Sequence, residues 1–299
     1  MHSSVQASQL KLMIMKDAAV LFVCLALAIL RPGVEAVSPP YLLDPQCAKE
    51  VHVQVVNGQD ASILNNPWMA QIIEGGSFIC GGSLISPRYV LTAAHCRGKT
   101  NQGLKVRLGD YNIGTQFDCT NEGCIPRPKD YAVDRTFVHR SFVEYHNYDL
   151  ALLRLNTAVP YGVHIRPVCL LMGGNSNWRW NLLQTIPSFN VTGWGRTATT
   201  KVSFPLQQAE LQHYDNSHCI RSFGRQLDHT HICAGQPYSF TCNGDSGGPL
   251  TAKAPAVAGN HIVLFGLVSY GFNQCNGPSV FTNVLPYTNW ILWHINRYP

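Results

Sequence analysis

A serine within a glycine-rich stretch is the clearest candidate for chemistry in this sequence. Ser246 lies between Asp245 and the pair Gly247-Gly248. A serine hydroxyl is a weak nucleophile unless a base takes its proton and N–H donors stabilise the oxyanion that it creates. Gly244 lets the backbone turn so that successive N–H groups can point at one spot. The same composition also forms ordinary surface turns, so a base and an orienting acid must be found elsewhere.

His95 and Asp149 are the candidates for those two partners. His95 lies in the apolar stretch of residues 91–96, and Asp149 opens an apolar run that ends at Leu155. A histidine can take up a proton near neutral pH, and a carboxylate beside it can hold the ring in the required tautomer. The three residues together indicate nucleophilic catalysis by a serine.

Three short segments, in this order, resemble the active-site signatures of the chymotrypsin/trypsin family of serine endopeptidases: residues 93–96, 149–153 and 244–249. The resemblance extends over residues 55–299 and implies an all-β fold of two packed six-stranded antiparallel β-barrels with a C-terminal helix. It implies that Ser246 attacks a peptide carbonyl to form an acyl-enzyme, while His95 moves the proton and Asp149 orients His95. The N–H groups of Gly244 and Ser246 would form the oxyanion hole.

A non-catalytic function is the alternative to proteolysis. Secreted protease homologues can act as binding or regulatory modules, and such homologues usually lack a member of the triad. This chain keeps all three residues, which favours an active peptidase.

The same resemblance locates the primary specificity pocket. Counting back from Ser246 without a gap places Phe240 at the base of that pocket. Trypsin-like members have an aspartate there, which pairs with Arg or Lys of the substrate, so Phe240 implies a different specificity. A one-residue bulge would instead turn Phe240 away and place Ser239 or Thr241 at the base.

The walls of the pocket are expected between Cys242 and Cys275 and just beyond. Gly271 would leave one wall open, and Ser279 adds a hydroxymethyl group where glycine is common. Ser269, Tyr270 and Gly271 would supply the edge strand that pairs with the substrate backbone. None of these side chains is acidic, which disfavours Arg and Lys, and the Phe240 ring would take up depth, which disfavours large aromatic residues. Small or medium apolar substrate residues are therefore expected before the scissile bond.

Residues 1–36 have the pattern of a signal peptide. Lys11 and Lys16 precede an apolar run over residues 18–30, and small residues at Val34 and Ala36 suit cleavage after Ala36. The run is shorter than the ~20 residues that span a bilayer. A signal anchor is the alternative, but secretion to the extracellular space, with no membrane attachment after cleavage, is the expectation.

Residues 37–54 form the expected pro-segment, followed by a peptidase domain over residues 55–299. The family resemblance implies that Val55 becomes a new N-terminus, whose ammonium pairs with Asp245 beside the nucleophile. That ion pair would hold the Gly244 N–H in place. The chain departs from the family at Gln54, where zymogens usually have Arg or Lys. Activation by a trypsin-like enzyme and autoactivation are therefore both in doubt, and the activating protease stays open.

Cysteine usage indicates an oxidising compartment. Of eleven cysteines, Cys24 leaves with the signal peptide. The family resemblance implies the pairs Cys47–Cys169, Cys80–Cys96, Cys219–Cys233 and Cys242–Cys275, and leaves Cys119 and Cys124 to pair locally. No Cys-x-x-Cys motif is present, so disulfides are favoured over a zinc site, and neither a metal nor a cofactor is expected.

Low charge narrows the range of partners. Charged residues make up 13% of the chain and the formal net charge is +5, without a basic run. This composition gives no support for nucleic-acid binding. The expected partners are protein or peptide substrates, an upstream activating protease and protein inhibitors.

Short strands separated by turn residues fill the peptidase domain. The clearest strand candidates are residues 78–84, 89–93, 105–108, 150–155, 262–270 and 279–284. Residues 189–195 are expected to start the second barrel with a strand that leads to Gly193 and Gly195, and residues 287–297 have helix-like apolar spacing. Residues 170–185 break the apolar pattern and are expected to link the two barrels. The sequon at Asn190 falls in a strand, where a glycan has little room.

A polar loop from Asp110 to Cys124 resembles loops of insect protease-cascade enzymes that carry clip domains. Residues 37–54 contain a single cysteine, too few for a clip domain. Asp110 and Asp118 could bind Ca²⁺, although solvated loop carboxylates are the favoured interpretation.

Overall fold

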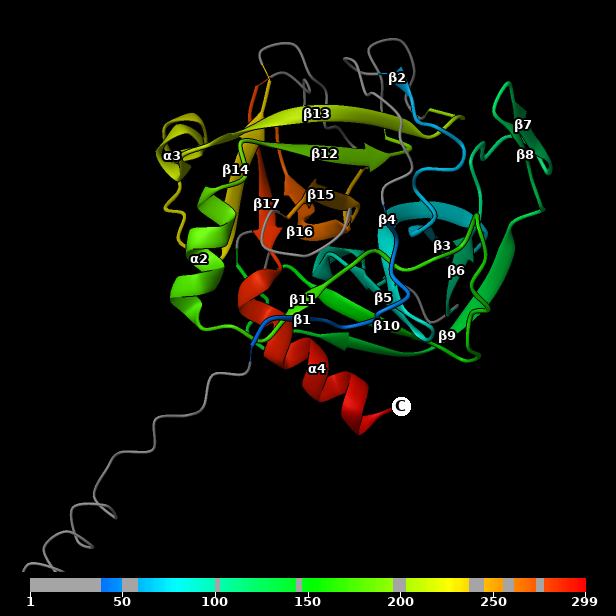
Figure 1. Ribbon diagram of the computed structural model, residues 1–299, viewed down its shortest axis with the longest axis horizontal. Coiled ribbons are helices and arrows are strands. Elements are labelled where there is room, and N and C mark those ends of the chain that lie inside the picture. The colour runs from blue at the N-terminus through cyan, green and yellow to red at the C-terminus, as the bar shows by residue number, and fades with distance from the viewer. Residues whose placement is uncertain are drawn as a thin grey trace, which may run out of the picture. The chain divides into compact units, whose positions relative to one another are not determined.

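Short antiparallel strands make up most of the molecule (Figure 1). The computed structural model describes residues 39–49, 59–99, 103–143, 147–195, 203–236, 245–254, 261–272 and 277–299. Val55, Phe240, Gly244, Cys242 and Cys275, which the sequence singles out, lie outside these residues. The segments expected to form the signal peptide and the activation cut also lie outside them.

Six strands close the first barrel in the order β10-β5-β4-β3-β6-β9. Their bounds are β3 Met69–Glu74, β4 Ser77–Ser86, β5 Tyr89–Thr92, β6 Leu104–Leu108, β9 Lys129–Val138 and β10 Ala151–Leu155. Gly75 and Gly76 join β3 to β4 with φ of 58° and 83°. Two positive φ angles in a two-residue loop match the right-handed twist of the hairpin, and glycine takes them without steric cost. The interior is aliphatic, with Ile72, Leu84 and Val106 buried.

The second barrel contains β12 Ser188–Gly193, β13 Gln207–Tyr214, β14 His231–Gly235, β15 Pro249–Lys253, β16 Ile262–Tyr270 and β17 Ser279–Asn283. The order is β12-β15-β16-β17-β14-β13, and pairing of β12 with β13 closes it. The short strand β2 (Gln59–Asp60) adds to β13. Phe189, Phe265 and Phe281 fill the interior. The two six-stranded antiparallel barrels confirm the predicted fold class.

A shared core joins the barrels. The largest cluster of buried side chains contains Leu91 and Leu152 of the first barrel, Leu264 of the second, and Ile291 of the C-terminal helix α4 (Thr288–Arg297). Each barrel therefore buries apolar surface of the other, and the site between them is held by both.

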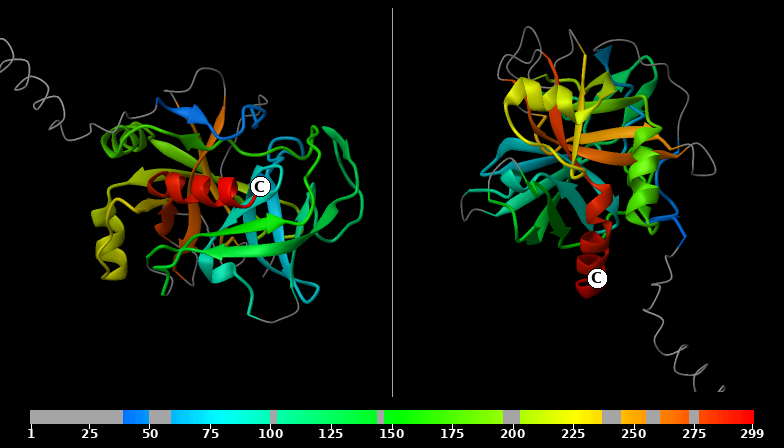
Figure 2. Two further views of the ribbon diagram at one scale, coloured as in Figure 1. Left: turned by 90° about the horizontal axis from the view of Figure 1, so that it is seen from below. Right: turned by 90° about the vertical axis from the view of Figure 1, so that its left-hand side faces the viewer.

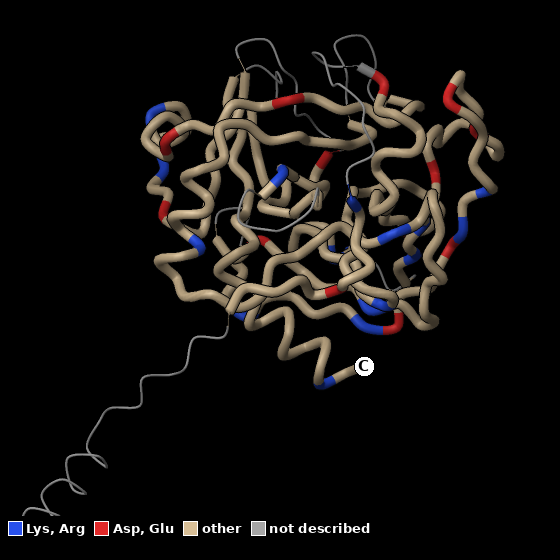
Figure 3. Tube along the Cα trace, viewed as in Figure 1, with Lys and Arg blue, Asp and Glu red and all other residues tan. Residues whose placement is uncertain are grey.

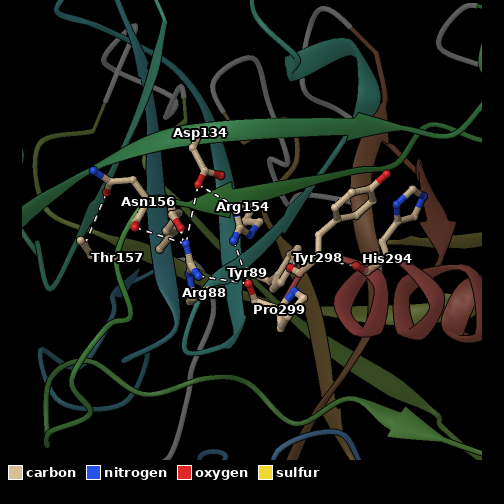
Figure 4. Close-up of polar contacts among 10 residues, drawn as sticks. Arg88, Tyr89, Asp134, Arg154, Asn156, Thr157, His294, Tyr298 and Pro299 are labelled. Carbon is tan, nitrogen blue, oxygen red and sulfur yellow. Dashed lines mark hydrogen bonds and ion pairs between the residues drawn. The ribbon is translucent and has the colours of Figure 1, made fainter.

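The end of the chain returns to the first barrel, as Figure 4 shows. Tyr89 donates a hydrogen bond to the main-chain oxygen of Tyr298. Arg88 and Arg154 donate to the Pro299 oxygen at 3.1 and 2.7 Å. Asp134 lies between the two guanidinium groups, 2.7 Å from that of Arg154. These contacts tie α4, which follows the second barrel, to strands β5, β9 and β10 of the first.

Helices outside the barrels are the main departure from the sequence-based picture. Residues 170–185 lie between β10 and β12, but they include strand β11 (Leu171–Met172) and helix α2 (Ser176–Gln184), which the apolar pattern did not predict. The Asn175 side chain accepts the Trp178 N–H and caps α2. Helix α3 (Asn216–Phe223) was also missed. Figures 1 and 2 place α3 and the hairpin of β7 (Asp118–Thr120) and β8 (Gly123–Ile125) at opposite ends.

The described residues contain four disulfides: Cys47–Cys169, Cys80–Cys96, Cys119–Cys124 and Cys219–Cys233. They are four of the five pairs expected, and the fifth lies outside the described residues. In the part of the chain that the structure describes, no helix is long and apolar enough to cross a bilayer.

The expectation of solvated carboxylates in the loop from Asp110 to Cys124 is wrong. Asp110 and Asp118 are 7% and 4% exposed. Asp118 accepts the main-chain N–H groups of Tyr111 and Asn112 at 3.0 Å, as well as the Thr115 hydroxyl. Burial raises the pKa of Asp110 to about 6, and the charge of Asp118 adds to the rise. The loop looked solvated because its residue types are polar, whereas its main chain folds around the carboxylates.

Asp110 should make the stability depend on pH. Its folded pKa of about 6 lies above the ordinary value of 3.8. Between those values the folded state holds more protons than the unfolded state, so stability falls as pH rises through that window. Asp110→Asn removes the ionisation. In EDTA-containing buffer at pH 7, its free energy of unfolding should exceed that of the wild type by on the order of 1–2 kcal/mol. It should therefore unfold at a higher temperature, and this difference should shrink at pH 4.5.

Thermal unfolding at pH 4.5, 5.5 and 7 measures this difference. Glu122→Gln, an exposed change in the same loop, is the control. An advantage of Asp110→Asn that is the same at all three pH values would contradict the prediction.

Candidate active site

Strand pairing brings His95 and Asp149 together. His95 lies in the 3-10 helix Ala94–Cys96, which follows β5 after one residue, and Asp149 lies two residues before the start of β10. The strands are antiparallel, with Thr92 opposite Ala151. The segment after one strand and the segment before the other therefore meet at the same edge of the barrel.

The Asp149 carboxylate is buried, with 1% of the residue exposed, and three donors surround it. The His95 N–H donates to Oδ1 at 3.0 Å, and His95 Nδ1 lies 2.8 Å from Oδ2. The Ser269 hydroxyl donates to Oδ2 at 2.6 Å. Because an ionised carboxylate only accepts, the contact between His95 Nδ1 and Asp149 Oδ2 selects the Nδ1–H tautomer of His95 and leaves Nε2 as the basic nitrogen.

Ser246 comes from the second barrel and is fixed to the first by its main chain. The turn before β15 is closed by the Gly248 N–H and the Asp245 oxygen at 2.8 Å, and the Ser246 oxygen accepts the Gly81 N–H of β4 at 2.9 Å. The Thr92 hydroxyl donates to the Gly81 oxygen at 2.8 Å. The serine turn therefore lies against the strands that lead into His95. His95 and Ser246 are partly exposed, in contrast to Asp149.

Glycine is required where the turn meets the first barrel. Gly247 has φ +75°, and a β-carbon there would overlap the Thr92 hydroxyl. At Gly81 an added β-carbon would lie 3.2 Å from Gly248 Cα. Side chains at these positions would separate Ser246 from the first barrel.

The Asp245 carboxylate lies against Gly193 and Gly195. Gly195 donates its N–H to Asp245 Oδ1 at 2.8 Å, and Asp245 is 7% exposed. A β-carbon at either glycine would overlap this carboxylate. The sequence pointed to residues 193–195 only as the end of a strand, and missed that both glycines make room for Asp245. Its expected partner, Val55, lies outside the described residues.

Three of the expected specificity residues are brought close together. Tyr270 ends β16 opposite Val280 of β17, and Gly271 follows. A β-carbon at Gly271 would lie 2.7 Å from Ser279 Oγ, so these two residues face each other. Ser269 instead contacts Asp149. The expected base of the pocket, Phe240, is outside the described residues.

An aromatic group beside Tyr270 was missed by sequence analysis. Phe223 of α3 stacks on Phe272 with centroids 4.6 Å apart, and meets Tyr270 edge-on at 5.4 Å. The disulfide Cys219–Cys233 fixes α3 to β14. Phe223 lies four residues after Cys219 and so on the same helix face, which was the available signal.

The cysteines near His95 are not set up for a metal. Cys80, Cys96 and His95 are close enough to share an ion, as are Cys47, Cys169 and His261. In both groups the two cysteines form a disulfide. A disulfide lacks the thiolate that zinc binds, so these groups do not support the zinc alternative.

Comparison with known proteins agrees with this geometry. The family model described as Trypsin matches residues 55–291. Serine protease grass from Drosophila melanogaster is 34% identical over 261 residues, which cover 82% of this chain and 68% of that protein. Phenoloxidase-activating factor 1 from Holotrichia diomphalia is 35% identical over 278 residues, 84% of this chain and 73% of that protein.

A solved structure gives the same result. The crystal structure of the Drosophila Grass clip serine protease of the Toll pathway superimposes with a TM-score of 0.73 at 32% identity, covering 88% of this chain and 76% of that chain. The match of the family model to most of the chain, together with these relatives, means that the chain belongs to the trypsin family of serine proteases.

Proposed function

We propose that this chain is a secreted serine endopeptidase, made as a zymogen, that cleaves peptide bonds with a Ser246–His95–Asp149 triad. The observation that carries the proposal is the buried Asp149 carboxylate, which accepts from the main-chain N–H of His95 and from Nδ1 of its ring. An orienting acid held in this way is needed for a histidine base, and is expensive to keep in a protein without that use.

Each residue has a defined task in the proposed reaction. Ser246 Oγ attacks the peptide carbonyl while His95 Nε2 takes its proton and then returns it to the leaving amine. Asp149 stabilises the imidazolium that forms. The N–H groups of Gly244 and Ser246 stabilise the oxyanion. A water molecule then attacks the acyl-enzyme while His95 takes its proton. His95 gives that proton to Ser246 Oγ as the acid product leaves.

The relatives favour protein substrates. Their names refer to the Toll pathway and to phenoloxidase activation. On this likeness we extend protein substrates, an upstream activating protease and extracellular action to the present chain. Charged residues of both signs are interspersed along the described chain (Figure 3). We therefore assign the selection of substrates to the pocket and to the end of β16 rather than to a charged surface. Strand β16 is an interior strand paired with β15 and β17, but its residues after Val268 extend beyond its pairing with β15.

Covalent labelling tests the catalytic proposal. In the protein cut before Val55, a fluorophosphonate should modify Ser246, because only an activated serine reacts. Ser246→Ala should abolish the adduct, and Asp149→Asn should slow turnover by about 10⁴-fold. Mass spectrometry locates the adduct. A correctly cut, folded wild-type protein without an adduct would favour the non-catalytic binding module.

Trypsin should not activate the unmodified zymogen. Gln54 offers no charge for a trypsin-like enzyme before Val55. Gln54→Arg supplies that charge and should make activity appear on trypsin treatment. N-terminal sequencing checks for a chain that begins at Val55. Efficient activation of the unmodified chain by trypsin would contradict the prediction.

Small or medium apolar residues should be preferred before the scissile bond. Phe240, Gly271 and Ser279 offer no carboxylate, and an unpaired buried Arg or Lys is costly. Phe240→Asp should raise the relative rate on Arg or Lys substrates by about tenfold, since a charge-assisted hydrogen bond contributes roughly 1.5 kcal/mol or more. A peptide-library profile measures the preference. Preference for Arg or Lys in the unmodified enzyme would refute Phe240 as the base, and preference for large aromatic residues would favour the bulge.

A further inference from the structure

Tyr148, the residue before Asp149, has an unusual backbone conformation. Among the described residues it is the non-glycine residue with a positive φ, 57°. A residue with a β-carbon is disfavoured in this left-handed region because the β-carbon approaches a neighbouring carbonyl oxygen. Such a conformation persists only where surrounding contacts hold it.

The left-handed residue sets the direction of the Asp149 side chain. The Leu150 N–H donates to the Tyr148 oxygen at 2.8 Å, which closes a three-residue turn with Asp149 at its centre. The Thr282 hydroxyl of β17 donates to the Asp149 main-chain oxygen at 3.0 Å. Since the peptide planes on both sides of Asp149 fix its Cα–Cβ bond, a right-handed Tyr148 would turn the carboxylate away from His95.

Aromatic side chains hold Tyr148 in this conformation. Its ring lies parallel to that of His139, with centroids 4.7 Å apart and 6° between the planes. Tyr287 meets the Tyr148 ring edge-on at 6.1 Å. His139 in turn packs against Tyr287 at 5.5 Å and Trp290 at 5.6 Å. The His139 N–H donates to the Leu150 oxygen at 3.3 Å.

These contacts come from three parts of the chain. His139 follows β9, Tyr287 ends a 3-10 helix, and Trp290 lies in α4. Tyr148 as a residue is 38% exposed, so these contacts cover it only in part. A tyrosine that served only to fill space would not require a left-handed backbone.

We propose that Tyr148 is a positioning residue for Asp149. Its ring, stacked on His139 and packed against Tyr287, stabilises the left-handed conformation that turns the Asp149 carboxylate toward His95 and Ser269. The consequence for turnover rests on the proposed proteolytic function, whereas the consequence for the Asp149–His95 hydrogen bond does not.

A series of substitutions at Tyr148 separates the backbone from the ring. Tyr148→Phe keeps the stack. Tyr148→Gly, Tyr148→Asn and Tyr148→Val all remove it, but glycine and asparagine accept a left-handed backbone, whereas valine resists it. Phe117→Ala, which removes an exposed aromatic ring from the loop that leads to β7, is the matched control. All variants are measured as the full chain cut before Val55.

The expected rank follows backbone preference and not side-chain size. Tyr148→Phe and Phe117→Ala should keep kcat within about twofold. Tyr148→Val should have a kcat about 5- to 30-fold below that of Tyr148→Gly, since the left-handed conformation is disfavoured for a β-branched residue. KM should change little, because the orientation of His95 acts on proton transfer and not on substrate binding.

His139→Ala provides a second test. With Tyr148 present it should lower kcat, because the stack is lost. In the Tyr148→Gly background it should have little further effect, because no ring remains to be held and the backbone no longer needs it. Additive losses in this double-mutant cycle would argue against the stack.

Proton NMR gives a readout that does not depend on activity. In protein labelled with ¹⁵N-histidine, the proton on His95 Nδ1 should give a downfield resonance because it is hydrogen-bonded to a carboxylate, and Asp149→Asn should shift it strongly. Tyr148→Phe and Tyr148→Gly should keep this resonance. Tyr148→Val should broaden or lose it.

The outcomes distinguish this inference from the proposed function. Equal kcat and an unchanged resonance in Tyr148→Gly and Tyr148→Val would overturn the positioning role, whatever their unfolding temperatures. A wild type that fails to label Ser246, while the resonance responds in the expected order, would refute the proteolytic function and leave the positioning role standing.

Discussion

The structure depends on keeping one buried charge supplied with hydrogen-bond donors. Asp149 is 1% exposed, and an ionised carboxylate without partners costs several kcal/mol at such a position. Its donors come from both barrels, with His95 from the first and Ser269 from the second, and Thr282 of the second barrel binds its main-chain oxygen. The barrels therefore have to meet in one relative position, because any shift would leave the carboxylate short of a donor. The apolar cluster between the barrels supplies the attraction, and the carboxylate selects the geometry.

Close approach of main chains is the second condition, and glycine meets it. The Ser246 turn reaches β4 because Gly247 leaves room for the Thr92 hydroxyl, and Gly81 lets the two backbones come within hydrogen-bonding distance. Asp245 is accommodated in the same way by Gly193 and Gly195. These positions contribute little apolar burial of their own. Their effect is to let the donors and acceptors of the site come close enough to pair.

The sequence predicts elements that have a regular apolar pattern or match a family signature. It does not predict features that depend on a single local contact. Strand runs such as residues 262–270 are readable because a buried strand is continuously apolar, and β16 has those bounds. Helix α2 is not readable, because few of its residues are apolar and buried and its start rests on the single cap from Asn175. Burial of Asp110 and Asp118 follows from the path of the loop main chain, which residue types do not reveal. The left-handed Tyr148 was likewise invisible, since tyrosine carries no preference for that conformation.

The expected pro-segment is built into the fold well beyond its disulfide. Strand β1 (Tyr41–Leu42) pairs with β11, and Tyr161 donates to Asp44 at 2.6 Å. The Ala48 N–H donates to the Pro167 oxygen at 2.8 Å, and the Ala48 oxygen accepts the Ile262 N–H at 3.2 Å. These contacts reach the segment between the barrels and the first residue of β16, whose far end contributes Ser269 to the site. The proposed cut before Val55 would break none of them, because all involve residues 39–49. Residues 39–49 would therefore stay packed against the peptidase domain after such a cut.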